Sequence, residues 1–197
     1  MSTNVKKFLT PQTIEVQSLN QNRALVSLQP FEEGFGHTLG NALRRILLSS
    51  IPGCAVIEVK IEGVLHEYSS LEGVQEDIMD ILLNLKGIAF ILHDKEEAVL
   101  ELVKNTVGPV CAGDIKLPYD VEIKNPDYVI AHLTKPKEFK MTLKVAKGRG
   151  YQLASVRKTD QYVSEVGALQ LDAQFNPIIR VTYSVENARV EQHTNLD

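Results

Sequence analysis

Cysteine is nearly absent from this chain of 197 residues, which contains only Cys54 and Cys111. The two cysteines are far apart, and neither they nor the five scattered histidines show the spacing of metal ligands. We therefore expect no metal site. An isolated pair of cysteines is typical of reduced thiols that pack as small apolar side chains in a cytosolic protein.

Long apolar segments are also missing. No stretch approaches the roughly 18 uninterrupted apolar residues that spanning a bilayer requires. Lys6 and Lys7 near the N-terminus are not followed by the apolar region of a secretory signal. We expect no membrane association, and the expected location is the cytoplasm.

A basic excess and the motifs of catalysis are lacking as well. The net charge is −4, with both signs interspersed, whereas proteins that bind phosphates by charge usually carry a basic stripe. No P-loop, nucleophile motif or dinucleotide fingerprint occurs, so we expect neither a cofactor nor independent catalysis. Asp77 and Asp80 are three residues apart on the expected second helix and could in principle chelate Mg²⁺, as nucleotide polymerisation requires. However, no glycine-rich phosphate loop accompanies them. For one basic cluster a solvated loop is favoured over a nucleic-acid site: Lys144, Lys147, Arg149, Arg157 and Lys158.

What is present is a series of short strand-like patterns around two helical ones. Residues 13–28 alternate as a hairpin with its turn near residues 19–22, and helices are expected over 37–50 and 70–86. Residues 147–166 form a polar excursion. Further strands are expected over 55–61, 98–103, 121–124, 128–133, 139–145, 168–175 and 178–185. Because strands and helices do not alternate regularly, the predicted class is α+β.

The first helix has an apolar stripe that must be buried against something. At about 100° per residue, one face collects Leu39, Ala42, Leu43, Ile46 and Leu47. The other side carries Leu48 between two arginines, and spacing alone leaves open whether this side is a protein-contact patch or a solvated face. Gly40 costs the helix about 1 kcal/mol relative to alanine, which indicates that another backbone approaches there.

The second helix repeats this pattern. Its expected buried stripe is Val74, Ile78, Ile81, Leu82 and Leu85. The opposite side carries Glu76, Met79, Asp80 and Leu83, with Lys86 at the edge. Apolar side chains among charges suit either a contact surface or a helix of imperfect amphipathicity, and the pattern does not decide between them.

Several long runs resemble the bacterial RNA polymerase alpha subunit family. The first run covers residues 34–50, from Gly34-Phe35-Gly36 to Ser49-Ser50. Matching runs follow in the same order over residues 63–69, 72–77, 82–87, 147–151 and 188–192. The chain therefore resembles the N-terminal assembly domain of that family.

The resemblance implies a two-part α+β fold. A discontinuous dimerisation subdomain would hold residues 1–52 and 178–197, with the first helix at the twofold axis, and an inserted α/β subdomain would hold residues 53–177. The implied partner is a second alpha chain, identical or paralogous. The dimer-interface residues would be Leu39, Gly40, Ala42, Leu43, Ile46 and Leu47.

The resemblance also implies a role without chemistry of its own. In this family the alpha dimer recruits the beta subunit and then beta-prime, within a DNA-directed RNA polymerase, a nucleotidyltransferase that is associated with the nucleoid. The implied beta contacts are Arg45, Leu48 and Asp80, where Asp80 replaces a more usual glutamate. The implied beta-prime contacts are Lys86, Leu171 and Ile178.

Members of the family continue beyond the position that matches Asp197. They add a second interface helix, a linker and a small domain that touches promoter DNA and activators. Residues 1–197 do not include those parts. No direct DNA contact is therefore expected from this chain.

Overall fold

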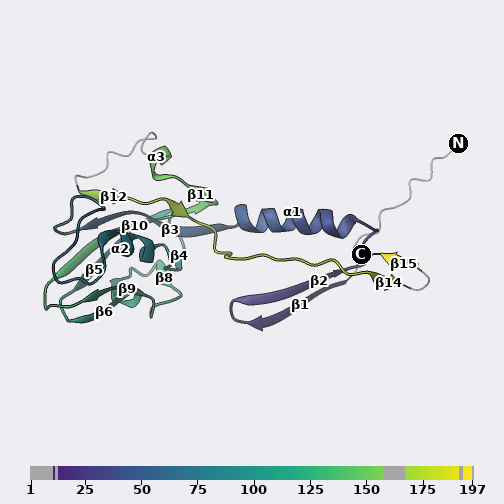
Figure 1. The fold of residues 1–197 in the computed structure, drawn as a ribbon, viewed down its shortest axis with the longest axis horizontal. Helices are drawn as coiled ribbons and strands as arrows, with labels where there is room; N and C mark the ends of the chain where they lie inside the picture. Colours follow the sequence, from purple (N-terminus) through teal and green to yellow (C-terminus); the bar gives the residue numbers. More distant parts are fainter. Residues whose placement is uncertain (1–10, 12, 158–166, 191–192, 197) are drawn as a thin grey trace. The chain divides into compact units, whose positions relative to one another are not determined.

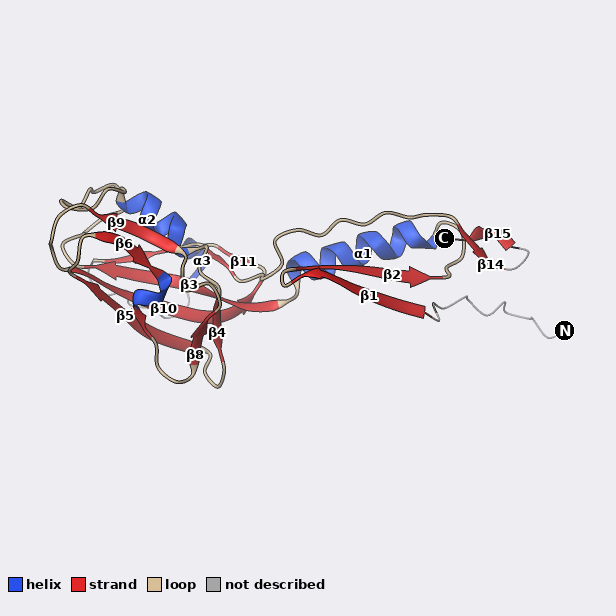
Figure 2. Cartoon of the chain, turned by 90° about the horizontal axis from the view of Figure 1, so that it is seen from below, coloured by secondary structure: helices blue, strands red, loops and turns tan. Residues whose placement is uncertain are grey.

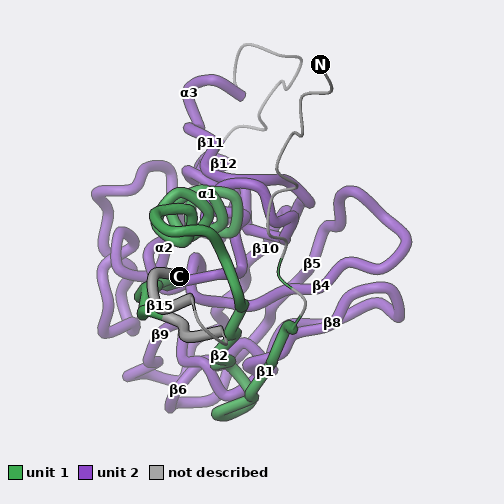
Figure 3. Tube along the Cα trace, turned by 90° about the vertical axis from the view of Figure 1, so that its right-hand side faces the viewer, with its two compact units in different colours: residues 1–47, 180–197 green, residues 48–179 purple. Residues whose placement is uncertain are grey.

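The computed structural model describes residues 11, 13–157, 167–190 and 193–196. The chain divides into two compact units (Figure 3). Unit 1 holds Met1–Leu47 and Arg180–Asp197, and unit 2 holds Leu48–Ile179. Unit 2 thus covers residues 48–179, whereas the inserted subdomain expected from the sequence covers residues 53–177.

Unit 1 contains the expected hairpin and the first helix. Strands β1 (Thr13–Asn20) and β2 (Arg23–Gln29) pair antiparallel, with Ile14 opposite Leu28 and Val16 opposite Val26. Helix α1 (Phe35–Ser49) follows, and β14 (Ala188–Val190) pairs with β15 (His193–Leu196). The predictions of the hairpin and of this helix are confirmed.

The described part of unit 1 has almost no core. Phe31 is its only buried hydrophobic side chain, and the Phe31 ring lies 5.9 Å, centroid to centroid, from the ring of Phe35. The apolar residues of the hairpin are mostly exposed. The apolar surface of this unit is therefore not covered by the described chain.

The strand expected over 178–185 is wrong for this chain, since the structure assigns no strand to residues 175–187. A strand needs a neighbouring strand to complete its hydrogen bonds. Val181 and Tyr183 instead contact α1: the Arg44 side chain donates a hydrogen bond to the carbonyl of Val181, and the Tyr183 ring lies against Gly40.

Unit 2 is built on a five-stranded antiparallel sheet (Figures 1 and 2). Its strand order is β12 (Ala168–Gln170), β3 (Pro52–Ile61), β10 (Phe139–Arg149), β5 (Glu97–Lys104) and β7 (Ile115–Lys116). The described residues of unit 2 also form three two-stranded ribbons. These are β4 (Phe90–Leu92) with β8 (Val121–Ile123), β6 (Gly108–Cys111) with β9 (Val129–Leu133), and β11 (Tyr151–Gln152) with β13 (Ala173–Gln174). The helices are α2 (Ile78–Leu85), α3 (Ala154–Arg157) and the 3₁₀ turn η1 (Ala112–Asp114). The α+β class is confirmed.

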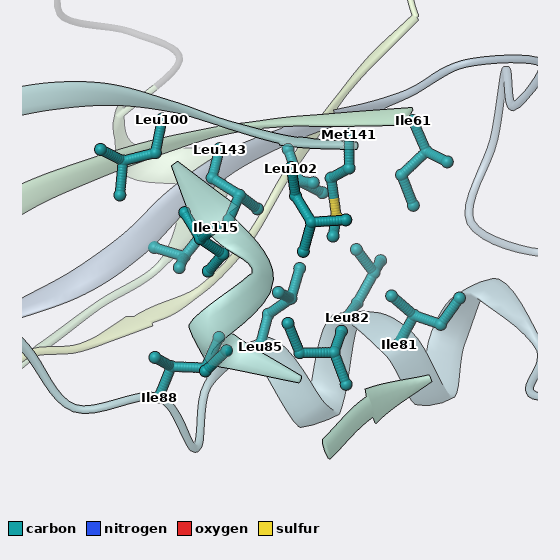
Figure 4. Close-up of a cluster of buried hydrophobic side chains, with 14 of the residues drawn as sticks. Ile61, Ile81, Leu82, Leu85, Ile88, Leu100, Leu102, Ile115, Met141 and Leu143 are labelled. Carbon is teal, nitrogen blue, oxygen red and sulfur yellow. The ribbon is translucent and has the colours of Figure 1, made fainter. Parts of the chain in front are cut away.

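One face of the sheet packs against α2 to form the main core (Figure 4). Alternate residues of β10 point into this core, as their spacing predicts: Phe139, Met141, Leu143 and Val145. From α2 come Ile78, Ile81, Leu82 and Leu85, all buried. Most of the stability of unit 2 is expected from this apolar burial.

A β-bulge at Ile57 interrupts the alternation of β3, so the residues before and after it point to different sides of the sheet than regular alternation predicts. Glu58 lies opposite Lys144 and Val56 opposite Val145, which leaves Ile57 as the extra residue. Val59 and Ile61 then face the main core, whereas Ile57 joins a second cluster. Regular alternation along the predicted strand 55–61 would place Ala55, Ile57, Val59 and Ile61 on one side, and the bulge at Ile57 breaks that alternation.

Helix α2 is shorter than the predicted 70–86. Gly73 has a left-handed backbone, with φ of +89°, which ends any regular structure before it. Val74 forms a β-bridge with Leu133, and the Gln75 N–H donates to the carbonyl of His132 at 3.0 Å. Residues 74–75 therefore pair with β9 rather than extend the helix.

No helix in the described residues is long and apolar enough to cross a membrane.

Candidate subunit-contact surfaces

The apolar stripe of α1 is not buried within the described chain. Its members are Leu39, Ala42, Leu43, Ile46 and Leu47, and no residue of α1 is buried. Ile46 is 52% exposed and Leu43 is 38% exposed. The described residues of the chain therefore do not bury this stripe, although the sequence pattern requires that it be buried. Large exposed apolar faces are typical of interaction sites, so the α1 stripe is a candidate contact surface.

Gly40, on the edge of this stripe, is approached by a side chain of the same unit. A Cβ atom at Gly40 would lie 2.5 Å from Cδ2 of Tyr183. The expectation of a second backbone at Gly40 is therefore corrected, because the Tyr183 ring occupies that space. The His37 ring also packs edge-on against Tyr183, with 6.3 Å between centroids.

The beta contacts implied by the resemblance fall on two helices. Arg45 is exposed on α1, in unit 1. Leu48 is half-buried at the end of α1, where its carbonyl accepts a hydrogen bond of 2.9 Å from Asn176 Nδ2. Asp80 is exposed in the first turn of α2, where a negative charge interacts favourably with the helix dipole.

The exposed side of α2 keeps the apolar side chains that the pattern placed there. Met79 and Leu83 are both exposed, beside Asp80. Glu76 does not belong to this surface, because it precedes the helix. Its Oε1 lies 2.5 Å from His132 Nδ1, and its Oε2 accepts the His132 N–H at 2.7 Å.

Of the implied beta-prime contacts, Lys86 and the Leu171 segment lie within electrostatic reach of each other. Hydrogen bonds from the Ala154 N–H and the Tyr151 hydroxyl lower the pKa of Asp172, and the charge of Lys86 lowers it further. The side chain of Leu171 itself is only 3% exposed, in the main core. A partner that contacts this segment would therefore meet Lys86 and Asp172 rather than the Leu171 side chain.

Ile178 is half-buried and is held in place by one neighbour. Asn176 Nδ2 donates to the carbonyl of Ile178 at 2.8 Å, and the Ile178 N–H donates to Asn176 Oδ1 at 3.3 Å. The same Asn176 amide binds the carbonyl of Leu48. One asparagine thus links an expected beta contact to an expected beta-prime contact within unit 2.

Two polar clusters were not predicted from the sequence. One is the Glu76–His132 pair, whose members lie 56 residues apart. The other is the buried Asp120, whose carboxylate forms an ion pair with Lys95, with an N–O distance of 2.8 Å. Neither pair has a spacing signal in the sequence, because the fold brings distant segments together. Among the described residues, no group of three or more His, Cys, Asp or Glu side chains is placed to hold a metal ion.

Comparison with known families gives the context of these surfaces. The chain matches the RNA polymerase Rpb3/RpoA insert domain family over residues 59–176, which is more than half of its length. The chain belongs to this family. It is therefore a subunit of a DNA-directed RNA polymerase of the Rpb3/RpoA type.

The matched insert domain lies within unit 2 and contains α2 and most of the five-stranded sheet. Asp80, Lys86 and Leu171 are inside the matched range, whereas Arg45, Leu48 and Ile178 are outside it. The Rpb3/RpoA insert domain thus carries the exposed side of α2, and α1 is separate from it.

Proposed function

We propose that this Rpb3/RpoA-type subunit is a bacterial alpha subunit, a non-catalytic scaffold that dimerises and then assembles the beta and beta-prime subunits in the cytoplasm. The dimerisation subdomain would hold residues 1–52 and 178–197, and residues 53–177 would form the inserted subdomain. The second chain in the dimer is either an identical or a paralogous alpha.

The observation that carries this proposal is the uncovered stripe of α1. Five apolar residues share one face of the helix, none of them is buried, and the described part of unit 1 buries one hydrophobic side chain. Apolar surface removed from water stabilises an interface by about 25 cal/mol per Å². A second α1 packed on this stripe would supply the burial that unit 1 lacks.

The polar sides of α1 and α2 support the assembly role. Arg45 and Leu48 on α1 and Asp80 on α2 combine charge with apolar surface, as interface residues commonly do. Lys86, with the segment around Leu171 and Ile178, would form the beta-prime contact. These roles come from the resemblance of the sequence, and the exposure of Arg45, Asp80 and Lys86 is compatible with them.

Stepwise reconstitution tests the proposal. The chain is first analysed by sedimentation over a range of concentrations, and is then mixed with purified beta and afterwards with purified beta-prime. We expect a dimer that retains beta and then beta-prime on size-exclusion chromatography. A chain that stays monomeric and retains neither subunit contradicts the proposal. Mass spectrometry of polymerase purified from cells decides between identical and paralogous alpha partners.

A further inference from the structure

Tyr151 presents an aromatic ring beside the segment that carries the expected beta-prime contacts. The residue begins β11, which pairs antiparallel with β13, so that Tyr151 lies opposite Gln174. Tyr151 is 58% exposed, although its hydroxyl is engaged in a hydrogen bond. None of the contact roles discussed so far uses this ring.

The Tyr151 side chain is held at both ends. At the backbone, strand pairing fixes the residue against β13. At the tip, the hydroxyl donates to Asp172 Oδ2 at 2.8 Å, while Asp172 Oδ1 accepts the Ala154 N–H at 2.8 Å. The hydrogen bond to Asp172 raises the pKa of Tyr151, as expected for a hydroxyl that donates to a carboxylate. The ring is therefore exposed to solvent while its orientation is already ordered.

A lysine adjoins the same carboxylate. Lys86 directly follows α2, and its charge acts on Asp172, in addition to the hydrogen bonds that Asp172 accepts. Lys86 is exposed, and within the described part of the chain no carboxylate forms an ion pair with it. Since both oxygens of Asp172 already accept hydrogen bonds, the charge of Lys86 remains available to a partner.

Leu153 adds apolar surface next to the ring. It lies two residues after Tyr151 and is 48% exposed. A single exposed apolar side chain needs no explanation. An ordered tyrosine beside an exposed leucine and a lysine is different, because tyrosine is enriched among the hot spots of interfaces and combines an apolar ring with a polar tip.

We propose that Tyr151 is an anchor of the beta-prime contact, and that Tyr151 and Lys86 together bind a segment of beta-prime in which an apolar side chain lies next to an aspartate or glutamate. The choice of partner rests on the proposed function. Asp172 links Tyr151 to Lys86 and follows Leu171 in the chain, so this surface is continuous with the expected beta-prime contact. An acidic side chain complements the charge of Lys86, and an apolar one packs on the ring of Tyr151.

The first experiment compares variants in the assembling complex. Complexes of beta with wild-type chain, Tyr151→Ala or Tyr151→Phe are assayed for capture of beta-prime. We expect Tyr151→Ala to weaken capture more than tenfold, the loss typical of a truncated hot spot. Tyr151→Phe keeps the ring but releases its tip, so a smaller loss is expected, because the ring must then be ordered on binding.

Tyr119 provides the matched control for Tyr151→Ala. It is 93% exposed in the turn before β8, so Tyr119→Ala removes an equally large ring from another part of unit 2. This variant should capture beta-prime like the wild type. Circular dichroism shows whether each variant folds.

The second experiment needs no substitution and decides the matter if Tyr151→Ala does not fold. Hydroxyl radicals oxidise exposed aromatic rings, and mass spectrometry gives the extent of oxidation at each tyrosine. The wild-type complex with beta is labelled before and after beta-prime is added. We expect beta-prime to lower the labelling of Tyr151 and to leave that of Tyr119 unchanged.

The outcomes separate this proposal from the proposed function. If the wild type captures beta-prime, equal capture by folded Tyr151→Ala, or undiminished labelling of Tyr151 in the captured complex, overturns the anchor and leaves the scaffold role in place. If the wild-type chain retains no beta-prime at all, both the anchor and the proposed function are contradicted.

Discussion

The ring of Tyr183 lies against the backbone of Gly40, so close that a Cβ atom there would be 2.5 Å from the ring carbon Cδ2. Both residues belong to unit 1. Glycine inside a helix costs about 1 kcal/mol relative to alanine. The close ring of Tyr183 is a structural reason for tolerating that cost.

Replacing Gly40 with alanine is therefore expected to destabilise the chain in spite of alanine's higher helix propensity. The added methyl group requires the Tyr183 ring to move away from α1 and to lose its contacts there. Part of this loss is offset by the gain in propensity. Urea denaturation measures the change.

A double-mutant cycle provides the control. Gly40→Ala is measured with and without Tyr183→Ala, which removes the ring. We expect Gly40→Ala to become stabilising once the ring is absent. The same destabilisation in both backgrounds would show that Tyr183 is not the cause.

Leu43 tests the proposed dimer. Its side chain is 38% exposed in the single chain, so Leu43→Asp should leave the fold intact. In a dimer packed on the α1 stripe the aspartate would be buried without a partner, which is costly. Sedimentation equilibrium should show a dissociation constant raised by more than an order of magnitude, corresponding to about 2 kcal/mol or more.

Asn41→Asp is the matched control for Leu43→Asp. It introduces a carboxylate on the side of α1 opposite the stripe, where the side chain is exposed. This variant should dimerise like the wild type. Dimerisation of Leu43→Asp with wild-type affinity would contradict the placement of the stripe at the twofold axis.

The fold was predicted well where a single local pattern decides the structure. The alternation from Phe139 to Val145 gives the buried face of β10, and every inward residue is buried. The same alternation failed for β3, because the bulge at Ile57 depends on its pairing with β10. A bulge is set by two strands together and leaves little signal in either one.

Long-range pairing explains the other errors. Residues 74–75 fit a helical stripe, yet they pair with β9, which lies more than 50 residues further along the chain. Residues 178–185 alternate like a strand, but the structure assigns them no partner strand. Local periodicity cannot distinguish these cases, because the decisive hydrogen bonds involve distant segments.

The candidate contact residues come only in part from the sequence pattern itself. Helical periodicity gave the α1 stripe and the exposed side of α2, whereas the assignment of Arg45 or Lys86 to a particular partner came from the resemblance of the sequence. The hydrogen bond between Tyr151 and Asp172 was not predictable, because the pairing of β11 with β13 brings the two residues together only after folding. The burial of Leu171 was equally hidden from the sequence.

The Glu76–His132 pair predicts a dependence of stability on pH. Burial raises the pKa of Glu76, but hydrogen bonds from the His132 ring and backbone outweigh this effect and hold the pKa below its usual value. A lowered folded-state pKa stabilises the chain above the unfolded pKa of about 4.3, and this contribution is lost as pH falls through the folded-state value. Glu76→Gln should therefore cost about 1 kcal/mol at neutral pH.

The measurement is urea denaturation of wild type and Glu76→Gln between neutral pH and pH 3. The difference in the free energy of unfolding between wild type and Glu76→Gln should shrink as the pH falls below the ordinary pKa of glutamate. Glu72→Gln is the control, because Glu72 pairs with Lys135 at an exposed site and should contribute little. A difference that does not change with pH would contradict the role of the Glu76 charge.

Cys54 is expected to react slowly with thiol reagents. It packs against the main core, and burial raises the pKa of its thiol, although a backbone hydrogen bond from Leu92 acts in the opposite direction. At neutral pH little of the reactive thiolate is therefore present. Modification by an aromatic disulfide should be much slower in the folded chain than in urea, and it should accelerate as pH rises. Equal rates of modification with and without urea would contradict this prediction. The sequence predicts the same low reactivity for Cys111.

Arg45 is the decisive residue for the proposed recruitment of beta. It lies about 120° around α1 from the centre of the apolar stripe and is exposed, so its side chain is not expected to hold the dimer together. A guanidinium beside the apolar Leu48 suits a partner's carboxylate or carbonyl groups framed by hydrophobic surface. Arg45→Ala should therefore leave the fold and the dimer intact, and weaken binding of beta by more than an order of magnitude, as truncation of a hot spot costs about 2 kcal/mol or more.

The neighbouring arginine provides the matched control for Arg45→Ala. Arg44 donates to the carbonyl of Val181 within unit 1, so Arg44→Ala removes the same charge from α1 while breaking an internal contact. Co-purification with beta is compared for the two variants and the wild type, with circular dichroism and sedimentation as checks on fold and dimer. Arg44→Ala should retain beta and Arg45→Ala should not. Equal recovery of beta by both variants would show that charge at position 45 is not recognised, and unfolding of Arg45→Ala alone would make Arg45 a structural residue.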